Sequence, residues 1–212
     1  FDYWPWNRGH LNVEQYRTLL ARYGVSISVV NVPGAHGRLG APGQTIQARE
    51  ALLAAVNEAV ALEARYVQFY TGVDARPEFL TAVKTLARDL QPVLQRAEER
   101  GITLLLENNV DQRMEDRQGL NPSRRPEMVL ATLEEVNSPR LRLAYDPCNF
   151  HAAGYESYPY AYDLLKPWIE NVHLKDCVRF SPLFHAGAPN HDHLFVDVMG
   201  GAFLPVPVGQ GT

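Results

Sequence analysis

The sequence is poor in the features that mark secreted, membrane and nucleic-acid-binding proteins. Its 212 residues contain only two cysteines, which is typical of a reduced, cytoplasmic protein, with a single disulfide as the alternative. No apolar run approaches the roughly 20 residues that span a bilayer, and the first residues lack the basic and apolar regions of a signal peptide. The net charge is −4, and Arg124-Arg125 is the longest basic run, which disfavours contacts with nucleic-acid phosphates. We therefore predict a cytoplasmic protein without membrane or nucleic-acid partners.

Two common nucleotide-binding motifs are also absent. No Gly-x-Gly-x-x-Gly turn follows an expected strand, and no Gly-x-x-x-x-Gly-Lys loop is present. A dinucleotide-binding sheet needs the first motif, and a loop that cradles phosphates needs the second. Their absence weakens the case for an open, doubly wound sheet, which is the alternative to a closed barrel.

Short apolar strands alternate with amphipathic helices along the whole chain. This rhythm predicts parallel strands joined by helical crossovers in one domain, residues 1–212. Strands are expected at 25–32, 66–70, 102–106, 141–145 and 171–174, with a sixth at 1–4. Helices are expected between them, near 13–23, 46–63, 77–100, 125–136 and 160–169. Residues 177–208 exceed a normal loop, so we expect a long functional loop or a hairpin insertion there.

Local signals set several helix boundaries. Asn12 and Gln15 form a variant of the capping box before the first helix, and Gly24 suits the residue that follows its end. Pro92 lies inside the third helix, where it predicts a kink or a break. The second helix is expected to bury a face that carries Ile46, Leu53, Val56 and Val60.

Polar residues cluster where three of the expected strands end. Glu107, Asp146 and His173 lie at the carboxyl ends of the strands that begin at 102, 141 and 171. Because strand side chains alternate between faces, all three can point into a barrel, whose active face is built from these strand ends. Two carboxylates and an imidazole form a site for a divalent cation. Arg142 shares the face of Asp146, so we expect it at the barrel floor or in a pair.

With these residues in place, the chain resembles the sugar phosphate isomerase/epimerase superfamily, the xylose isomerase-like TIM barrels. The matching segments are LLLENN at 104–109, LAYDPCNF at 143–150, NVHLKD at 171–176 and PVGQGT at 207–212. The resemblance implies a (β/α)8 barrel and identifies Glu107, Asp146 and His173 as metal ligands. It predicts Mn²⁺ as the cofactor, with Zn²⁺, Co²⁺ or Mg²⁺ as alternatives.

The chain also departs from the family pattern. Compared with the family, it begins at the second strand and stops before the eighth, so that about six of the eight βα units are present. The eighth-strand Glu, usually the fourth ligand and second acid/base, is missing, and Gln210 lies where relatives often have Glu. We expect a fragment rather than a degenerate barrel, and this piece by itself need not be active.

Further residues near the strand ends are candidates for contact with substrate: Asn109, Asn149, Lys175, His36 and Tyr70. Each also has a structural interpretation. The asparagines could be turn residues, Lys175 could be ion-paired, and a structural role is the safer interpretation for His36 and Tyr70. Asp146 could cap the segment that begins at Pro147, and His173 could be a satisfied core histidine. Cys148 and Cys177 are expected to be small buried hydrophobes, and His191 and His193 to lie in a solvated loop.

The leading functional hypothesis is a metal-dependent isomerase or epimerase acting on a sugar, sugar phosphate or keto-polyol through an enediolate. Glu107 is its catalytic residue and moves a proton at the substrate carbon. The alternatives are a keto-polyol dehydratase of the same barrel family and a non-catalytic sugar-binding barrel. A barrel-type DNA-repair endonuclease is disfavoured, because the strand at 66–70 has no His. The expected partner is a small carbohydrate, and assembly into a homo-oligomer is left open.

Overall fold

The fold is described from a computed structural model that covers the chain in several segments. The described residues are 2–32, 39, 45–71, 79–110, 122–185, 194–196 and 201–211. The predictions for His36, His191 and His193 lie outside these residues.

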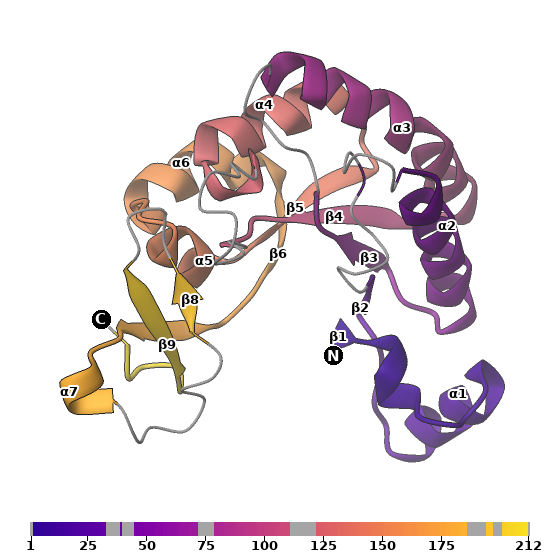
Figure 1. Ribbon diagram of the computed structural model, residues 1–212. Coiled ribbons are helices and arrows are strands. Elements are labelled where there is room, and N and C mark those ends of the chain that lie inside the picture. Colours follow the sequence, from indigo (N-terminus) through magenta and orange to yellow (C-terminus); the bar gives the residue numbers. More distant parts are fainter. Residues whose placement is uncertain are drawn as a thin grey trace.

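Six parallel strands form one curled sheet with helices on its convex side (Figure 1). The strands follow the order of the sequence: β1 Asp2–Tyr3, β2 Val29–Asn31, β3 Tyr66–Phe69, β4 Thr103–Glu107, β5 Leu141–Tyr145 and β6 Ile169–Val172. Sequential parallel pairing with helical crossovers is the pattern of a (β/α)8 barrel. The predicted incomplete TIM barrel is therefore confirmed, with β2 shorter than the strand expected at 25–32.

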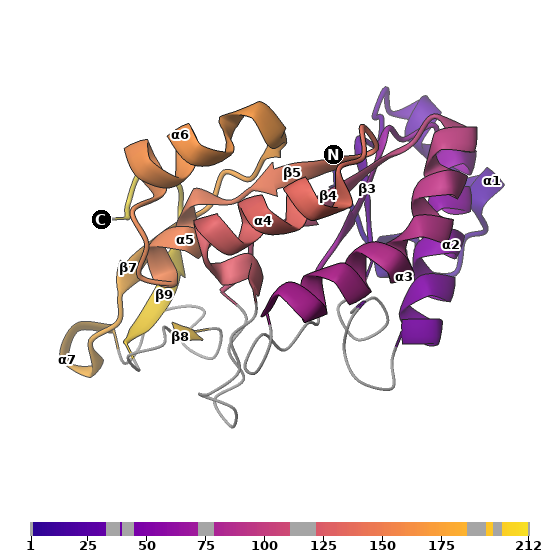
Figure 2. The ribbon, with the colours of Figure 1, turned by 90° about the horizontal axis from the view of Figure 1, so that it is seen from above.

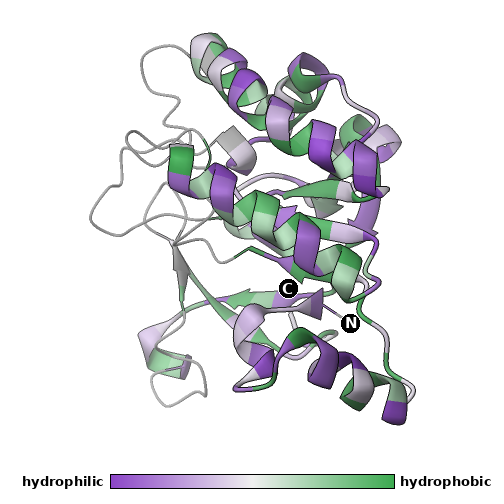
Figure 3. Ribbon diagram, turned by 90° about the vertical axis from the view of Figure 1, so that its right-hand side faces the viewer, coloured by the Kyte–Doolittle hydropathy of each residue, from purple (hydrophilic) through white to green (hydrophobic). Residues whose placement is uncertain are grey.

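The helices that cover the sheet are mostly those that the sequence predicts. They are α1 Val13–Arg22, α2 Thr45–Ala61, α3 Phe79–Arg100, α4 Pro126–Val136, α5 Pro147–Ala152 and α6 Tyr162–Leu165. Shorter turns span Pro5–Arg8, Pro122–Arg124, Ser157–Ala161 and Lys166–Trp168. Their ribbons carry hydrophobic and hydrophilic residues in alternation (Figure 3). This is the pattern of helices that pack one face on a sheet.

Two predictions from local signals concern α1 and α3, and of the kink or break expected in α3 the break is excluded. The capping box of α1 is present, with Asn12 and Gln15 bonded reciprocally. However, α3 runs unbroken through Pro92. Pro92 has no N–H, so it leaves the carbonyl of Arg88 without its helical hydrogen bond. Both residues lie on the solvent side of the helix, where water can bond that carbonyl.

The buried face of α2 agrees with the predicted one only in part: Val56 is buried and Leu53 packs against the core. Ile46 and Val60 are exposed. The residues that α2 buries are instead mostly small: Ala48, Leu52, Ala55, Val56 and Ala59. These five residues recur at the spacing of one helix face, and Ile46 and Val60 lie off that face.

Apolar residues fill both sides of the sheet. The main core lies between the sheet and the helices and includes Leu104, Leu106 and Leu143. A smaller cluster inside the barrel consists of Val29, Leu105 and Ala144, with Tyr66 packed against it. The two clusters alternate along each strand, as expected from strand parity. Glu107 follows Leu105 by two residues, and Asp146 follows Ala144 by two, so both carboxylates belong to the inner face.

A register shift in β6 determines which of its residues face inward. Leu143 pairs with Ile169, but Ala144 pairs with Asn171, so one extra residue, Glu170, stands in β6. Such a β-bulge re-aims the side chains that follow it. The strand also ends at Val172 instead of Leu174, although the His173 backbone N–H still donates to Tyr145 O at 2.9 Å.

Beyond β6 the chain forms a small antiparallel sheet at the opposite end of the molecule from α1 (Figure 2). Its strands, in the order β7-β9-β8, are β7 Asp176–Arg179, β9 Ala202–Val206 and β8 Phe195–Val196, and the helical turn α7 spans Pro182–His185. Within the segment 177–208, where a long loop or a hairpin insertion is expected, β8 and β9 pair antiparallel. Cys148 of α5 and Cys177 of β7 are buried in a second apolar cluster, as predicted. Among the described residues, no helix combines the length and apolarity needed to cross a membrane.

Candidate metal site

Glu107 ends β4 inside the barrel and is 3% exposed. Its carboxylate is held by neighbours from two other elements. Gln68 Nε2 of β3 donates to Glu107 Oε2 at 2.6 Å, and Asn149 Nδ2 of α5 donates to Glu107 Oε1 at 3.1 Å. These bonds fix the orientation of a carboxylate that is removed from water.

Asp146 follows β5 and is fully buried. One oxygen, Oδ1, accepts from Asn149 N at 2.8 Å and so caps the first turn of α5. The Asn108 side chain bonds both the N–H and the carbonyl of Asp146, each at 2.8 Å. Oδ2 receives no well-directed hydrogen bond and faces the Lys175 ammonium as an ion pair at 3.0 Å. Burial raises the pKa of Asp146, against the lowering effect of Lys175.

His173 joins the two carboxylates from the end of β6. Its Nδ1 lies 3.2 Å from Glu107 Oε1 and 3.9 Å from Asp146 Oδ2. Its Nε2 lies 3.4 Å from Asp2 Oδ2 of β1, across the barrel. Burial by itself lowers the pKa of His173, but the nearby carboxylates of Asp2 and Glu107 outweigh it and raise the pKa to about 10.

The three side chains fit a divalent cation. Each offers one ligand atom, and these atoms lie within 4.8 Å of one another. Two atoms that share a cation at about 2.0–2.2 Å are at most about 4.4 Å apart, which the two measured separations from His173 Nδ1 satisfy. Asp146 Oδ2 is buried and has the Lys175 ammonium as its ion-pair partner at 3.0 Å, with no hydrogen bond of good geometry. Two carboxylates and one imidazole suit Mn²⁺, Mg²⁺, Co²⁺ or Zn²⁺.

Three of the other predicted residues lie beside this cluster. Lys175 pairs with Asp146 and donates to Asn149 Oδ1. Asn149 is buried and bonds Glu107 and Asn108 O. Tyr70 follows β3, and burial together with a hydrogen bond to Glu107 raises its pKa far above the usual value, so that the phenol stays protonated.

One predicted residue and three unpredicted ones also lie near the cluster. The Asn109 backbone N–H donates to Ser123 O at 3.1 Å, which ties it to the helical turn Pro122–Arg124. The residues that sequence reasoning missed are Asp2, Gln68 and Asn108. A polar residue inside an apolar strand, as Gln68 is in Tyr-Val-Gln-Phe, could have revealed one of them.

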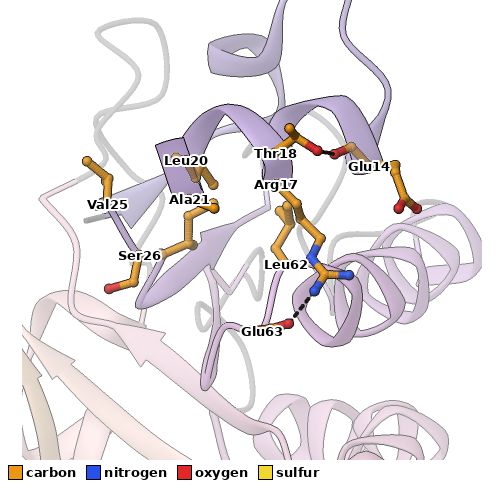
Figure 4. Close-up of a pocket in the computed structure, with 10 residues that line it drawn as sticks. Glu14, Arg17, Thr18, Leu20, Ala21, Val25, Ser26, Leu62 and Glu63 are labelled. Carbon is orange, nitrogen blue, oxygen red and sulfur yellow. Dashed lines mark hydrogen bonds and ion pairs between the residues drawn. The ribbon is translucent and has the colours of Figure 1, made fainter. Parts of the chain in front are cut away.

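The opposite end of the barrel contains a different kind of hollow. A cavity of about 470 Å³ lies between α1 and the residues that precede β2 and β3 (Figure 4). Arg17 and Glu63 form an ion pair at its wall, with side chains 46% and 74% exposed. Because this cavity adjoins the amino ends of the strands, it is separate from the metal site.

Comparison with known proteins is consistent with this architecture. The family described as xylose isomerase-like TIM barrel matches residues 3–211, so the chain belongs to that family. Comparison with curated proteins gives no match.

Solved structures show the same fold at low sequence identity. A xylose isomerase domain protein from Planctomyces limnophilus has a TM-score of 0.72 at 16% identity, covering 100% of this chain and 72% of that one. A xylose isomerase-like barrel protein from Mycobacterium smegmatis, in complex with magnesium, has a TM-score of 0.67 at 16% identity, covering 95% and 65%. A D-tagatose 3-epimerase-like protein has a TM-score of 0.65 at 21% identity, covering 78% and 61%. The chain therefore spans between 61% and 72% of the length of these three proteins.

Proposed function

We propose that this protein is a metal-dependent isomerase or epimerase acting on a sugar, sugar phosphate or keto-polyol through an enediolate. The observation that carries the proposal is the convergence of Glu107, Asp146 and His173 within 4.8 Å at the carboxyl ends of three barrel strands. This is the end at which TIM barrels hold their active sites. Epimerases and a dehydratase are among the proteins of similar structure.

The residues that would hold the cation are Glu107, Asp146 and His173, and Mn²⁺ is the ion that we propose, with Zn²⁺, Co²⁺ or Mg²⁺ as alternatives. A bound divalent cation supplies Lewis acidity that stabilises the charge of an enediolate. The Glu107 carboxylate would remove the proton from one face of the substrate carbon. Isomerisation needs that proton to return to the neighbouring carbon, and epimerisation needs a second acid on the opposite face, the role that the family resemblance gives to the eighth-strand Glu. Gln68 and Asn149 keep the Glu107 carboxylate oriented.

Two neighbouring groups complete the proposed site. Lys175 is a cation beside Asp146 and can bind substrate oxygens. The protonated Tyr70 phenol next to Glu107 can donate to a substrate oxygen. We propose both, with Asn149 and Asn109, as the residues that surround the substrate. The negative net charge and the absence of His in β3 favour a small carbohydrate over nucleic acid as the partner.

Dehydration of a keto-polyol is the second candidate, because removal of a proton next to a carbonyl begins that reaction too. A probable 3-DHS dehydratase from Bacillus anthracis has a similar structure, with a TM-score of 0.65. The two activities differ in product: an epimerase returns an isomer of the substrate, whereas a dehydratase releases water and forms a conjugated carbonyl that absorbs ultraviolet light.

The experiment combines metal analysis with solvent exchange. The protein, together with any sequence that its gene encodes beyond residues 1–212, is loaded with Mn²⁺ and incubated with a panel of ketoses in D₂O. Deuterium should enter the carbon next to the carbonyl of one ketose. Glu107→Gln should abolish this exchange while circular dichroism stays unchanged, and Glu98→Gln, a matched change on the surface of α3, should not.

Two outcomes would contradict the proposal. Deuterium exchange that survives Glu107→Gln would remove Glu107 from the catalytic role. Sugar binding without any exchange in the metal-loaded protein would indicate a non-catalytic sugar-binding barrel.

A further inference from the structure

Two buried amides stand side by side on the inner face of the barrel. Asn31 of β2 and Gln68 of β3 are each 1% exposed and are paired with each other in the sheet register. Residues paired in parallel strands point to the same side. Because Gln68 reaches Glu107, both amides lie on the face that carries the metal site.

The protein fixes the orientation of each amide through its nitrogen. Asn31 Nδ2 donates to the Tyr3 backbone carbonyl at 3.3 Å, and Gln68 Nε2 donates to Glu107 Oε2 at 2.6 Å. Both partners accept hydrogen bonds and cannot donate them, so neither amide can turn over. The two amide oxygens are therefore directed away from these partners.

Neither oxygen is satisfied within the described part of the chain. Asn31 Oδ1 and Gln68 Oε1 are buried and accept no hydrogen bond there. Buried polar atoms without partners are rare and unfavourable in native proteins. Here two such oxygens belong to paired residues beside the candidate metal site. A bound molecule that donates a hydrogen bond to each oxygen would explain them.

The chemistry of that molecule follows from the atoms that meet it. An amide oxygen accepts hydrogen bonds, so the ligand must offer donors. Carboxylate and phosphate groups offer none when ionised, and the nearby carboxylates of Glu107 and Asp146 would repel them. Neutral hydroxyl groups fit both conditions.

We propose that Asn31 and Gln68 form a subsite that accepts hydrogen bonds from substrate hydroxyl groups. The part of the substrate that lies next to β2 and β3 is then uncharged and carries hydroxyl groups. This inference rests on the proposed function, because it places the reacting carbon at Glu107. Gln68 is also a positioning residue for the Glu107 carboxylate. A phosphate group, where a substrate has one, lies away from these two strands.

The test measures sugar affinity separately from catalysis. The four D-2-ketohexoses are titrated by calorimetry into the Mn²⁺-loaded protein, and the best ligand is compared with its monodeoxy analogues. The wild type should bind one or two of these analogues about tenfold more weakly, because each loses one hydrogen bond. Asn31→Leu and Gln68→Met should bind the parent sugar about tenfold more weakly and should no longer discriminate against the corresponding analogue.

Matched controls are available on the surface. Gln95 donates to Glu99 on α3, as Gln68 donates to Glu107, and Asn57 is an exposed amide of α2. Gln95→Met and Asn57→Leu should bind every sugar as the wild type does. Where circular dichroism shows that Asn31→Leu or Gln68→Met has not folded, Asn31→Ala and Gln68→Ala replace them.

The outcomes separate this inference from the proposed function. If the variants retain both affinity and discrimination, or if the wild type binds Mn²⁺ but none of the ketohexoses, the hydroxyl subsite is overturned while the metal site stands. If the wild type binds none of Mn²⁺, Zn²⁺, Co²⁺ and Mg²⁺, the proposed function fails. In that case the same sugar titrations are repeated in EDTA. Loss of discrimination in the variants supports the hydroxyl subsite, and retained discrimination overturns it.

Discussion

Polar side chains at the two ends of the same barrel strands have opposite surroundings. At the carboxyl end, Glu107 and Asp146 are 3% and 0% exposed, and Asp146 Oδ2 receives no well-directed hydrogen bond. At the amino end, Arg140 and Glu98 form an ion pair at 2.7 Å with side chains 29% and 60% exposed. Arg142 also lies at this end, as predicted.

Arg142 shows how completely charges are satisfied at the amino end. Its Nη1 donates to Ser138 O and Leu141 O at 3.2 and 2.9 Å, and its guanidinium lies 5.6 Å from the centre of the Trp168 ring. Charged groups have partners at both ends, but only those at the carboxyl end are removed from water, where electrostatic interactions with a ligand are stronger. Burial, and not pairing, therefore distinguishes the candidate site from the barrel floor.

Of the substitutions that test this comparison, Asp146→Asn should have the largest effect, and the affinity for Mn²⁺ is the property that it changes. The amide oxygen of Asn can still cap α5, but the negative charge that faces the cation is lost. Mn²⁺ affinity measured by calorimetry should fall by more than about 100-fold, since loss of even an outer-shell partner costs about 10- to 100-fold. Asp163→Asn, at a side chain 59% exposed in an ion pair with Lys166, should bind Mn²⁺ normally. Wild-type affinity in Asp146→Asn would remove Asp146 from the ligand set.

Leu105→Ala tests the apolar layer that separates the two ends. Leu105 is fully buried inside the barrel with Val29 and Ala144, so truncation should lower the free energy of unfolding by about 2–5 kcal/mol. Leu183→Ala, at a side chain 89% exposed, should change it by less than about 0.5 kcal/mol. Urea denaturation measures both, and equal effects would show that the inner layer is not packed.

Asp176 offers a carboxylate whose pH dependence runs opposite to that expected of a buried acid. Backbone N–H groups of Gly211, Gly209 and Cys177 lower its pKa below the ordinary value of 3.8. The stabilisation of the 209–211 turn is therefore present above pH 3.8 and is lost as the pH falls through the lowered pKa. NMR shifts of the Gly209 and Gly211 amides should stay constant above that pH and change below it. The same transition in Asp176→Asn would assign it to another group.

Glu98→Gln should have the smallest effect of the series. Exposed ion pairs contribute little, because solvent screens them and ordering two long side chains costs entropy. The melting temperature and the Mn²⁺ affinity should both match the wild type within experimental error. A large loss of either would mean that the floor of the barrel contributes to the site.

Much of the fold and part of the site could be predicted from local patterns. Strand and helix order follow from the periodicity of apolar residues, and the start of α1 follows from Asn12 and Gln15. Glu107 and Asp146 could be assigned to the inner face, because each continues the alternation of a regular strand. These features depend on residues close together in the sequence.

Other features of the site depend on contacts between distant segments. In β6, Ile169 packs on the helical side and His173 still faces inward, because a bulge separates them. Asp2 meets His173 from the far end of the described chain only because the sheet curls. Gln68 and Asn108 acquire their roles from partners on neighbouring strands.

The sequence by itself determined the order of the elements and the residue types at the strand ends. The periodicity of apolar residues is a local property, and each strand end carries its polar residue wherever the strand comes to lie. The tertiary structure alone decided which side chains meet, because register and curvature arise from the packing of the whole sheet.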